Sequence, residues 1–367
     1  MFRRFLAVAF ILSSIHGNPL PAQLLHDQAA MTLVKKDIEC IYDFRFDEAR
    51  SIYNEICRSY PGHPVVFLLR GMTIYWENYP LLPASPSSSS FEDDMNRDIE
   101  LSEKNDYPGY EAEYLLANLC ARGLLLLFYT DNDLSKNVFP LTVSTYRHIR
   151  RSFDHTSACT DLYYFTGIYN YYREAYPRIY PVYKPLAALF PAGDIETGLK
   201  NLESSAAGSV VMGPESLFML FWIHLNFENN YPLALDYCKK LHALFPDNKL
   251  YLSNYIRNLL LLKRYDEAEE LTEASRDSAG NRYFAAQLNI FNGILQEKKY
   301  LNYEQARRYY DRGILELAPF GAYGNEYAGY GYFGLSRISA VRGEKSLSRK
   351  YRNEAVKRVD FRKINFD

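Results

Sequence analysis

Residues 46–61 read FDEARSIYNEICRSYP, and this stretch decides the fold because its spacing returns later in the chain. Ala49, Tyr53, Ile56 and Pro61 stand at offsets of 0, 4, 7 and 12 residues. The same offsets recur between Ala234 and Pro246, through Cys238 and Leu241. A spacing of 4 and then 3 places side chains on one face of a helix, and a proline shortly after it ends the helix.

The interval between these stretches is regular as well. Ala268 follows Ala234 by 34 residues, and Tyr-Asp-Glu-Ala at 265–268 echoes Phe-Asp-Glu-Ala at 46–49. A 34-residue period, with a small residue facing a neighbouring helix and a closing proline, resembles the tetratricopeptide repeat family. The resemblance implies antiparallel helix pairs stacked in a right-handed superhelix, because a single pair cannot bury its apolar face alone.

Helical periodicity accounts for nearly all of the chain after residue 27, and no alternating strand pattern is present. We therefore predict an all-α fold, an α-solenoid of about eight antiparallel helix pairs over residues 28–358, between a short leader (18–27) and a tail (359–367). The predicted pairs are 28–43 with 46–59, 64–78 with 91–104, 111–129 with 141–153, 159–175 with 194–207, 215–229 with 232–245, 249–262 with 265–277, 282–297 with 303–317, and 324–342 with 345–358.

Small residues recur where the two helices of a pair are expected to cross. Glycine inside a helix costs about 1 kcal/mol relative to alanine, so its recurrence at one register indicates a packing reason. The first helices carry Gly71, Gly123, Gly167, Gly293 and Gly334, and the second helices carry Ala49, Gly198, Ala234, Ala268 and Ala306.

Three long connections are expected between the two helices of a pair, at 79–90, 130–140 and 176–193. The first, rich in proline and serine, is interpreted as a mobile linker. Long loops in compact folds tend to be functional or disordered. Because all three join helix one to helix two, they are predicted to emerge on the same edge of the stack.

The third connection carries a narrower resemblance. Residues 184–190 (Lys-Pro-Leu-Ala-Ala-Leu-Phe) precede Gly193-Asp194, Gly198-Leu199 and Leu202. This order resembles the tetratricopeptide-repeat proteins linked to inclusion-body clearance and lipid droplets, in which a short apolar helix leads into Gly-Asp-x-x-x-Gly-Leu-x-x-Leu. The resemblance implies a shared loop architecture and not a shared function.

The beginning of the chain has the layout of a secretory signal peptide. Arg3 and Arg4 precede a mostly apolar run at 5–15 that is too short to span a bilayer, and Gly17 follows it. We therefore predict a signal peptide at 1–17, with an exported product that resides in the periplasm or cell envelope and has no membrane span after signal removal. The five cysteines could include a Cys40–Cys57 disulfide, or could all act as small buried hydrophobes.

Sequence signs of chemistry are few. Residues 329–334 spell G-x-G-x-x-G, but no strand precedes them, so they are interpreted as helix-packing glycines. Asp131-Asn132-Asp133 resembles the start of a calcium loop, but Lys136 occupies its glycine position, which favours a plain turn. The formal net charge of −2 does not favour nucleic acid. We expect no enzyme activity, cofactor or metal site.

The resulting functional prediction is a scaffold that binds a protein or peptide through its concave face or through the edge with the long loops. The alternatives are a component of an envelope assembly or glycan-uptake system and, third, an enzyme of unrecognised type. Solvent-facing groove positions read from the repeat register are Tyr164, Ile168, Tyr171, Met219, Ile223, Asn226, Ser253, Asn254 and Arg257. The anchors expected on the loop edge are Tyr176, Tyr180 and Tyr183, since tyrosine offers contact area at low entropic cost.

Overall fold

The computed structural model describes residues 24, 27–104, 109–276, 280–361 and 363–367. Within these ranges the fold is all-helical and contains no strand, so the prediction of an all-α chain is confirmed. The predicted signal peptide at 1–17 lies outside the described residues, as does most of the 18–27 leader.

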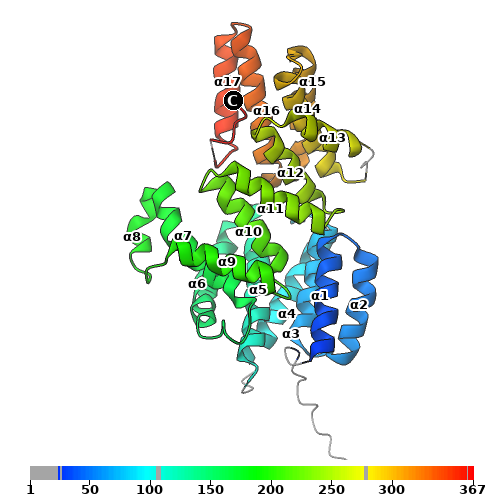
Figure 1. Ribbon diagram of the computed structural model, residues 1–367, viewed down its shortest axis with the longest axis vertical. Helices are drawn as coiled ribbons and strands as arrows, with labels where there is room; N and C mark the ends of the chain where they lie inside the picture. Colours follow the sequence, from blue (N-terminus) through cyan, green and yellow to red (C-terminus); the bar gives the residue numbers. More distant parts are fainter. Residues whose placement is uncertain (1–23, 25–26, 105–108, 277–279, 362) are drawn as a thin grey trace, which may run out of the picture.

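Consecutive helices pack as adjacent pairs along the chain (Figure 1). Their bounds are α1 Gln28–Tyr42, α2 Phe46–Ser59, α3 Pro64–Glu77, α4 Ser87–Lys104, α5 Glu111–Asp131, α6 Ser135–Ser152, α7 Leu162–Ile179, α8 Lys184–Ala187, α9 Ile195–Gly208, α10 Gly213–Asn226, α11 Tyr231–Leu244, α12 Lys249–Leu261, α13 Tyr265–Ala274, α14 Arg282–Lys298, α15 Tyr303–Leu317, α16 Ala322–Val341 and α17 Lys345–Val356. Two 3-10 turns, η2 (Pro181–Tyr183) and η3 (Ala318–Phe320), lie between them.

Polar side chains define where many helices begin. Asp27 accepts hydrogen bonds from the amides of Ala29 and Ala30 at the start of α1. Asn248, Asn281 and Asn302 play the same role for α12, α14 and α15. Such caps satisfy amides that have no partner inside the helix, so these boundaries follow directly from local sequence.

Most of the predicted packing glycines lie against the partner helix. A methyl group on Gly71 would lie 2.2 Å from the Cε of Met95, and one on Gly293 would lie 2.5 Å from the ring of Tyr310. Gly123 is the exception, because nothing lies within 4 Å of such a methyl group. The prediction of a packing role is therefore wrong for Gly123.

The connection predicted at 130–140 is wrong. Helix α5 continues to Asp131 and α6 begins at Ser135, so only residues 132–134 separate them. Pro140 lies inside α6 and is exposed. Water can therefore satisfy the carbonyl group that loses its helical hydrogen bond there.

The connection after α3 is not the mobile linker that the sequence suggests. Leu81 is fully buried, and its carbonyl oxygen accepts a hydrogen bond of 3.1 Å from the side-chain amide of Asn132. The ring of Tyr79 packs against Tyr283 and Tyr323, with centroid distances of 6.3 and 5.6 Å. This segment therefore joins the early helices to α14 and α16. Residues 87–90, assigned to the linker, form the first turn of α4.

The chain curls so that its first helix touches its middle. The Tyr42 hydroxyl, at the end of α1, donates a hydrogen bond of 2.6 Å to Glu215 in α10. The side-chain amide of Asn248 donates to the carbonyl oxygen of Tyr42 at 2.7 Å, and the Asp247 amide donates to Asp43 at 3.1 Å. The face that an open stack would leave free is thus partly filled by the chain itself.

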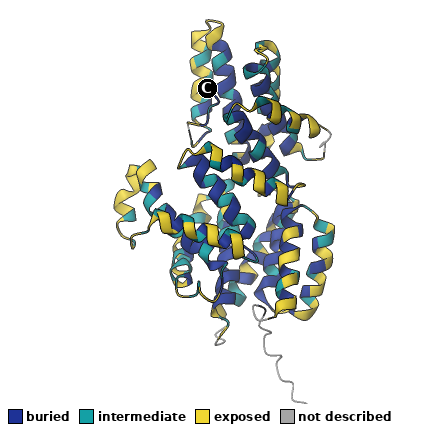
Figure 2. Cartoon of the chain, in the orientation of Figure 1, coloured by how far each residue is buried: buried dark blue, intermediate teal, exposed yellow. Residues whose placement is uncertain are grey.

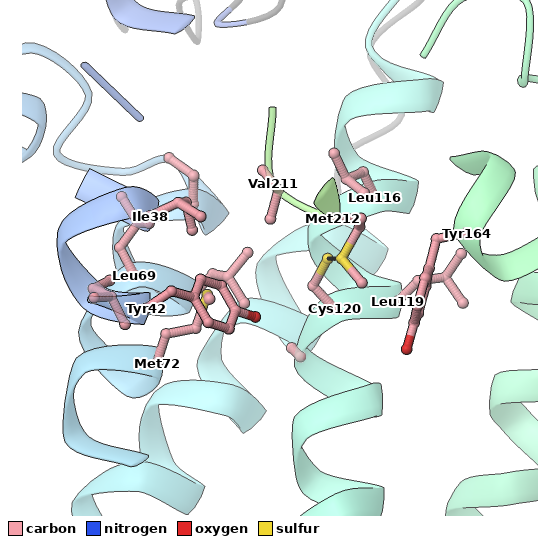
Figure 3. Packing of buried hydrophobic residues seen from close by; sticks show 14 of the residues in the cluster. Ile38, Tyr42, Leu69, Met72, Leu116, Leu119, Cys120, Tyr164, Val211 and Met212 are labelled. Atoms are coloured by element: carbon pink, nitrogen blue, oxygen red, sulfur yellow. Dashed lines mark hydrogen bonds between the residues drawn. The ribbon is translucent and has the colours of Figure 1, made fainter. Parts of the chain in front are cut away.

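The connection between α9 and α10 completes the core of the first half. Val211 and Met212 point in toward α5, where the sulfur atoms of Met212 and Cys120 lie 3.4 Å apart, beside Tyr42 of α1 (Figure 3). Buried Asp161 accepts hydrogen bonds from the amides of residues 210–212 at 2.7–3.1 Å and so fixes this connection. All five cysteines are free thiols, and only Cys57 among them is not fully buried.

Candidate functional site

The most exposed apolar part of the described chain is the arm formed by residues 176–193. It comprises the last turn of α7, η2, α8 and the connection to α9. In Figure 1 it projects to the left of the other helices, and Figure 2 shows it coloured mostly as exposed. The short helix that the local resemblance implied before Gly193 is present as α8. The predicted long connection at 176–193 is therefore present but partly helical.

The root of the arm is held by polar contacts to α7. The Arg173 guanidinium donates to the carbonyl oxygen of Phe190 at 3.1 Å. The Tyr169 hydroxyl donates to the carbonyl oxygen of Pro191 at 2.7 Å. The Phe190 ring also packs edge-on against Tyr146 of α6, with centroids 4.8 Å apart. These contacts hold the C-terminal end of the arm, and its N-terminal end continues α7, so a partner would meet a surface that is already ordered.

Gly193 closes the arm against α7. Its amide donates to Glu174 at 3.1 Å, and a methyl group added to it would lie 2.5 Å from the carbonyl oxygen of Asn170. Only glycine allows this approach without moving backbone. Asp194 then caps α9 by accepting a hydrogen bond of 2.7 Å from the amide of Thr197.

The three predicted anchors form one cluster of rings. The centroids of Tyr176 and Tyr180 lie 4.8 Å apart, and those of Tyr176 and Tyr183 lie 5.3 Å apart. Tyr176 and Tyr183 are 39% and 43% exposed. Partial burial is the largest cause that raises the pKa of Tyr176, and the nearby Tyr183 is the second. The Tyr176 hydroxyl therefore stays neutral at ordinary pH. The cluster therefore offers aromatic area with uncharged hydroxyl groups.

Beyond the tyrosines, the tip presents aliphatic side chains to solvent. Val182, Leu186 and Leu189 are 79%, 53% and 78% exposed. These side chains were not predicted from the sequence, because a single leucine in a loop does not indicate an interaction site. A signal that could have found this surface is that residues 175–193 contain no acidic residue. Arg178 and Lys184 are exposed and make no ion pair within the described part of the chain. The tip is thus apolar and basic.

The predicted groove positions are mostly buried, unlike the tyrosines of the arm. They were expected to face solvent, and that expectation is wrong for most of them. Met219 and Ile168 are half-buried, whereas the remaining members are buried, namely Tyr164, Tyr171, Ile223, Asn226, Ser253, Asn254 and Arg257.

For the positions on α12, the cause is that α16 packs against this helix. Arg257, 1% exposed, donates to Glu326 at 3.0 Å and lies over the ring of Tyr327 at 5.9 Å. The hydroxyl groups of Ser253 and Tyr327 are 3.0 Å apart. Residues that would line a wide groove in an open stack therefore hold two of its helices together.

A hollow of about 620 Å³ lies between α13, α14 and α15. Of its three arginines, Arg276 pairs with Glu273 at 3.1 Å and Arg312 pairs with Glu316 at 2.8 Å. Arg282 is the arginine of this lining that makes no ion pair with the described residues. The hollow is therefore a weaker candidate for a binding site than the arm.

The G-x-G-x-x-G and Asp-Asn-Asp stretches noted in the sequence form parts of helices and a turn. Residues 329–334 lie inside α16, where Gly334 packs on Tyr310. Asp131 is the last residue of α5, and Asn132 and Asp133 belong to the turn before α6. Among the described residues, no group of three His, Cys, Asp or Glu side chains could hold a metal ion. Within the same residues, only α5 is long and apolar enough to cross a membrane, and 72% of its apolar window is buried in the fold.

Comparison with known proteins adds no assignment. No protein-family model matches this chain, and no curated protein matches it.

Proposed function

We propose that this chain is an exported helical scaffold, a right-handed superhelix of tetratricopeptide-repeat type, that binds a protein partner through the α7–α8 arm. The observation that carries the proposal is the combination of a fixed root and an exposed apolar tip. Exposed contiguous apolar surface is costly in water and commonly marks an interaction site. The tip residues Val182 and Leu189 are more than three-quarters exposed.

The chemistry of the arm defines the partner surface. Tyrosine and leucine side chains suit an apolar groove, and Arg178 and Lys184 suit an acidic rim around it. We therefore infer a protein partner with an apolar pocket bordered by Asp or Glu. The concave face is the weaker choice, because Asn254, Arg257 and their neighbours are buried.

Site-specific photocrosslinking in the native envelope tests the proposal. A benzophenone amino acid at Leu189 should yield a discrete covalent adduct with one partner. The same amino acid at Leu315, which is 74% exposed on α15, is the matched control and should not. Adding Val182→Ser and Leu186→Ser should abolish the Leu189 adduct while the melting temperature stays unchanged, because both side chains are exposed. Identical adducts at Leu189 and Leu315, or none at either, would contradict the proposal.

A second measurement separates binding from folding. Changing Tyr176, Tyr180 and Tyr183 to Ser should remove partner capture with little loss of helicity, because their rings pack mainly on one another. A collapse of the melting transition would instead assign the tyrosines to the stability of the arm.

A further inference from the structure

The tail, residues 359–367, lies against the helices. Of its described residues, Val359, Ile364 and Phe366 are buried. The ring of Phe361 meets Trp222 and Phe227, with centroid distances of 6.0 and 5.6 Å. The tail therefore covers the end of α10 as well as part of α16.

A second aromatic contact lies farther along the tail. The Phe366 ring packs edge-on against Tyr330 of α16 at 5.1 Å. Phe366 has φ +58°, a left-handed conformation that a bulky residue adopts only where its contacts hold it. Phe361, Ile364 and Phe366 are thus seated at intervals of three and two residues.

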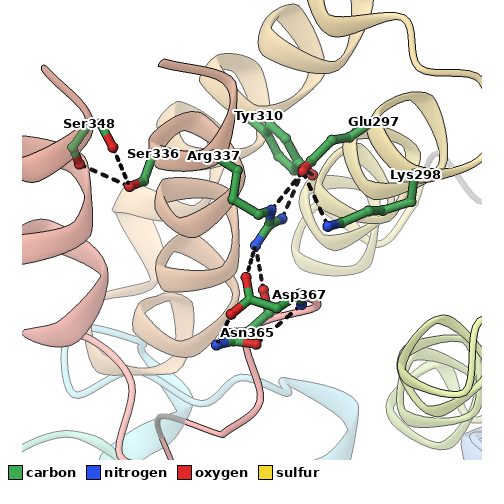
Figure 4. Close-up of polar contacts among 8 residues, drawn as sticks. All are labelled: Glu297, Lys298, Tyr310, Ser336, Arg337, Ser348, Asn365 and Asp367. Atoms are coloured by element: carbon green, nitrogen blue, oxygen red, sulfur yellow. Dashed lines mark hydrogen bonds and ion pairs between the residues drawn. The ribbon is translucent and has the colours of Figure 1, made fainter. Parts of the chain in front are cut away.

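Glu297, Tyr310 and Arg337, on α14, α15 and α16, form a cluster of polar side chains that the tail contacts. Glu297 of α14 accepts from the Arg337 Nε at 2.6 Å, and from the Tyr310 hydroxyl at 2.7 Å (Figure 4). These contacts hold the Arg337 guanidinium so that its Nη1 faces the tail. Nη1 donates to the carbonyl oxygen of Asn365 and lies 3.6 Å from the Asp367 carboxylate.

Side chains, and not backbone pairing, hold the tail in place. Within its described residues from 360 onward, the backbone–backbone hydrogen bond is a local one, from the Ile364 amide to the Phe361 carbonyl at 3.1 Å. Peptide-binding sites also recognise a segment through pockets for its side chains and through arginine that binds an acidic group. The same seats can therefore accept another segment of equal chemistry.

We propose that this surface, formed by Trp222, Phe227, Tyr330 and Arg337, is a peptide-binding site that the tail occupies in place of a partner. Its ligand is a protein segment of the pattern aromatic-x-x-aliphatic-x-aromatic-acidic that can adopt the turn seen between Phe361 and Ile364. The aromatic residues pack on α10 and α16, and Arg337 binds a backbone carbonyl and the acidic side chain. The site borders the arm, because the tail's Asp360 lies near enough to Tyr176 and Tyr180 to raise their pKa values. Its contacts with α10 and α16 do not involve the arm, so the proposal does not depend on whether the arm binds a partner.

A labelled peptide with the sequence of residues 359–367, amidated at its C-terminus, serves as the probe. The full chain with Phe361→Ser and Phe366→Ser should release its own tail and bind the probe at least tenfold more tightly than the unaltered chain. The reason is that a tethered tail competes at an effective concentration in the millimolar range, about 1 mM. A probe with serine at both phenylalanine positions should not bind.

The controls keep the result interpretable. The exposed-site change Leu315→Ser should leave probe affinity equal to that of the unaltered chain. If the double variant does not fold, probe affinity is measured with the single Phe361→Ser variant instead. That variant should fold, because the Phe361 side chain is only partly buried. Failure of the folded variant to bind the probe would overturn the proposal and would make the tail a fixed cap. Tail exchange between two copies, seen as a dimer of the unaltered chain by light scattering and lost in the variant, would also overturn it.

Discussion

Gly167 of α7 and Gly198 of α9 lie in direct contact, since a methyl group on either would be 3.0 Å from the carbonyl oxygen of the other. This crossing brings the backbones of the pair closer than any side chain permits. It confirms the sequence prediction that these two glycines face one another, and it makes the crossing sensitive to added volume.

Gly167→Leu should therefore destabilise the protein by about 1–3 kcal/mol, because Leu202 and the α9 backbone cannot move far enough. Thermal or urea unfolding measures the loss. The matched control is Gly123→Ala in α5, where nothing lies within 4 Å of the new methyl group. That change should stabilise by about 0.5–1 kcal/mol through helix propensity. Equal effects of the two substitutions would contradict the packing role of Gly167.

Leu81→Ala should cost about 2–4 kcal/mol, although Leu81 lies in a connection without helical structure, because its side chain is fully buried. The control is Ala84→Ser, four residues before Ser88, where the side chain is exposed and the change should cost less than about 0.5 kcal/mol. Urea unfolding of both variants gives the comparison. A neutral Leu81→Ala would support the mobile linker that the composition of 79–90 suggests.

Asp37→Asn should stabilise the protein at pH 8 but not near pH 4. Burial raises the pKa of Asp37 to about 8, and its carboxyl oxygens accept no hydrogen bond from the residues that the structure describes. The unfolded chain ionises this group above pH about 4 while the folded chain keeps the proton, so stability falls as pH rises from 4 to 8. The variant lacks this loss. Melting temperatures between pH 4 and 8 measure the difference.

The exposed residue Glu39, on the same helix, provides the comparison through Glu39→Gln, which should leave the pH profile as it is in the unaltered chain. A constant difference between Asp37→Asn and the unaltered chain across this range would show that Asp37 is ionised in the fold.

Arg257→Met should destabilise by about 2–4 kcal/mol, because it removes the partner of Glu326 and the hydrogen bond to Tyr330. Combining it with Glu326→Gln should recover part of that loss. A double-mutant cycle from urea unfolding should give a coupling of about 1–2 kcal/mol. Additive losses would mean that α12 and α16 are held together by packing alone.

The helices were predictable because their signals are local. Apolar periodicity and caps such as Asp27 and Asn248 lie within a few residues of the structure that they specify. The connection predicted at 130–140 is wrong because the turn needs only the three residues before Ser135, and α6 then continues through Pro140. Whether a proline ends a helix or lies within it depends on whether that side of the helix faces water, as it does at Pro140.

The candidate site was predictable only in part. The tyrosines at 176, 180 and 183 were found from local density of aromatic residues and proline, and the structure brings their rings together. The groove positions failed because their exposure depends on distant partners. Arg257 is covered by Glu326, which follows it by 69 residues, and no local pattern reports such a contact. The docked tail was missed for the same reason.

The contact between Tyr42 and Asn248 spans 206 residues, and it bears on how the chain can be made. In an open array each repeat needs only its neighbours, so repeats can be gained or lost at an end. Here the first helix obtains its final surroundings only after residue 248 has been synthesised. An N-terminal half produced alone would expose the surface that α10 and α12 cover. A helix pair between α1 and α12 therefore cannot be gained or lost without losing this contact, and this part of the chain should unfold as one transition instead of helix pair by helix pair.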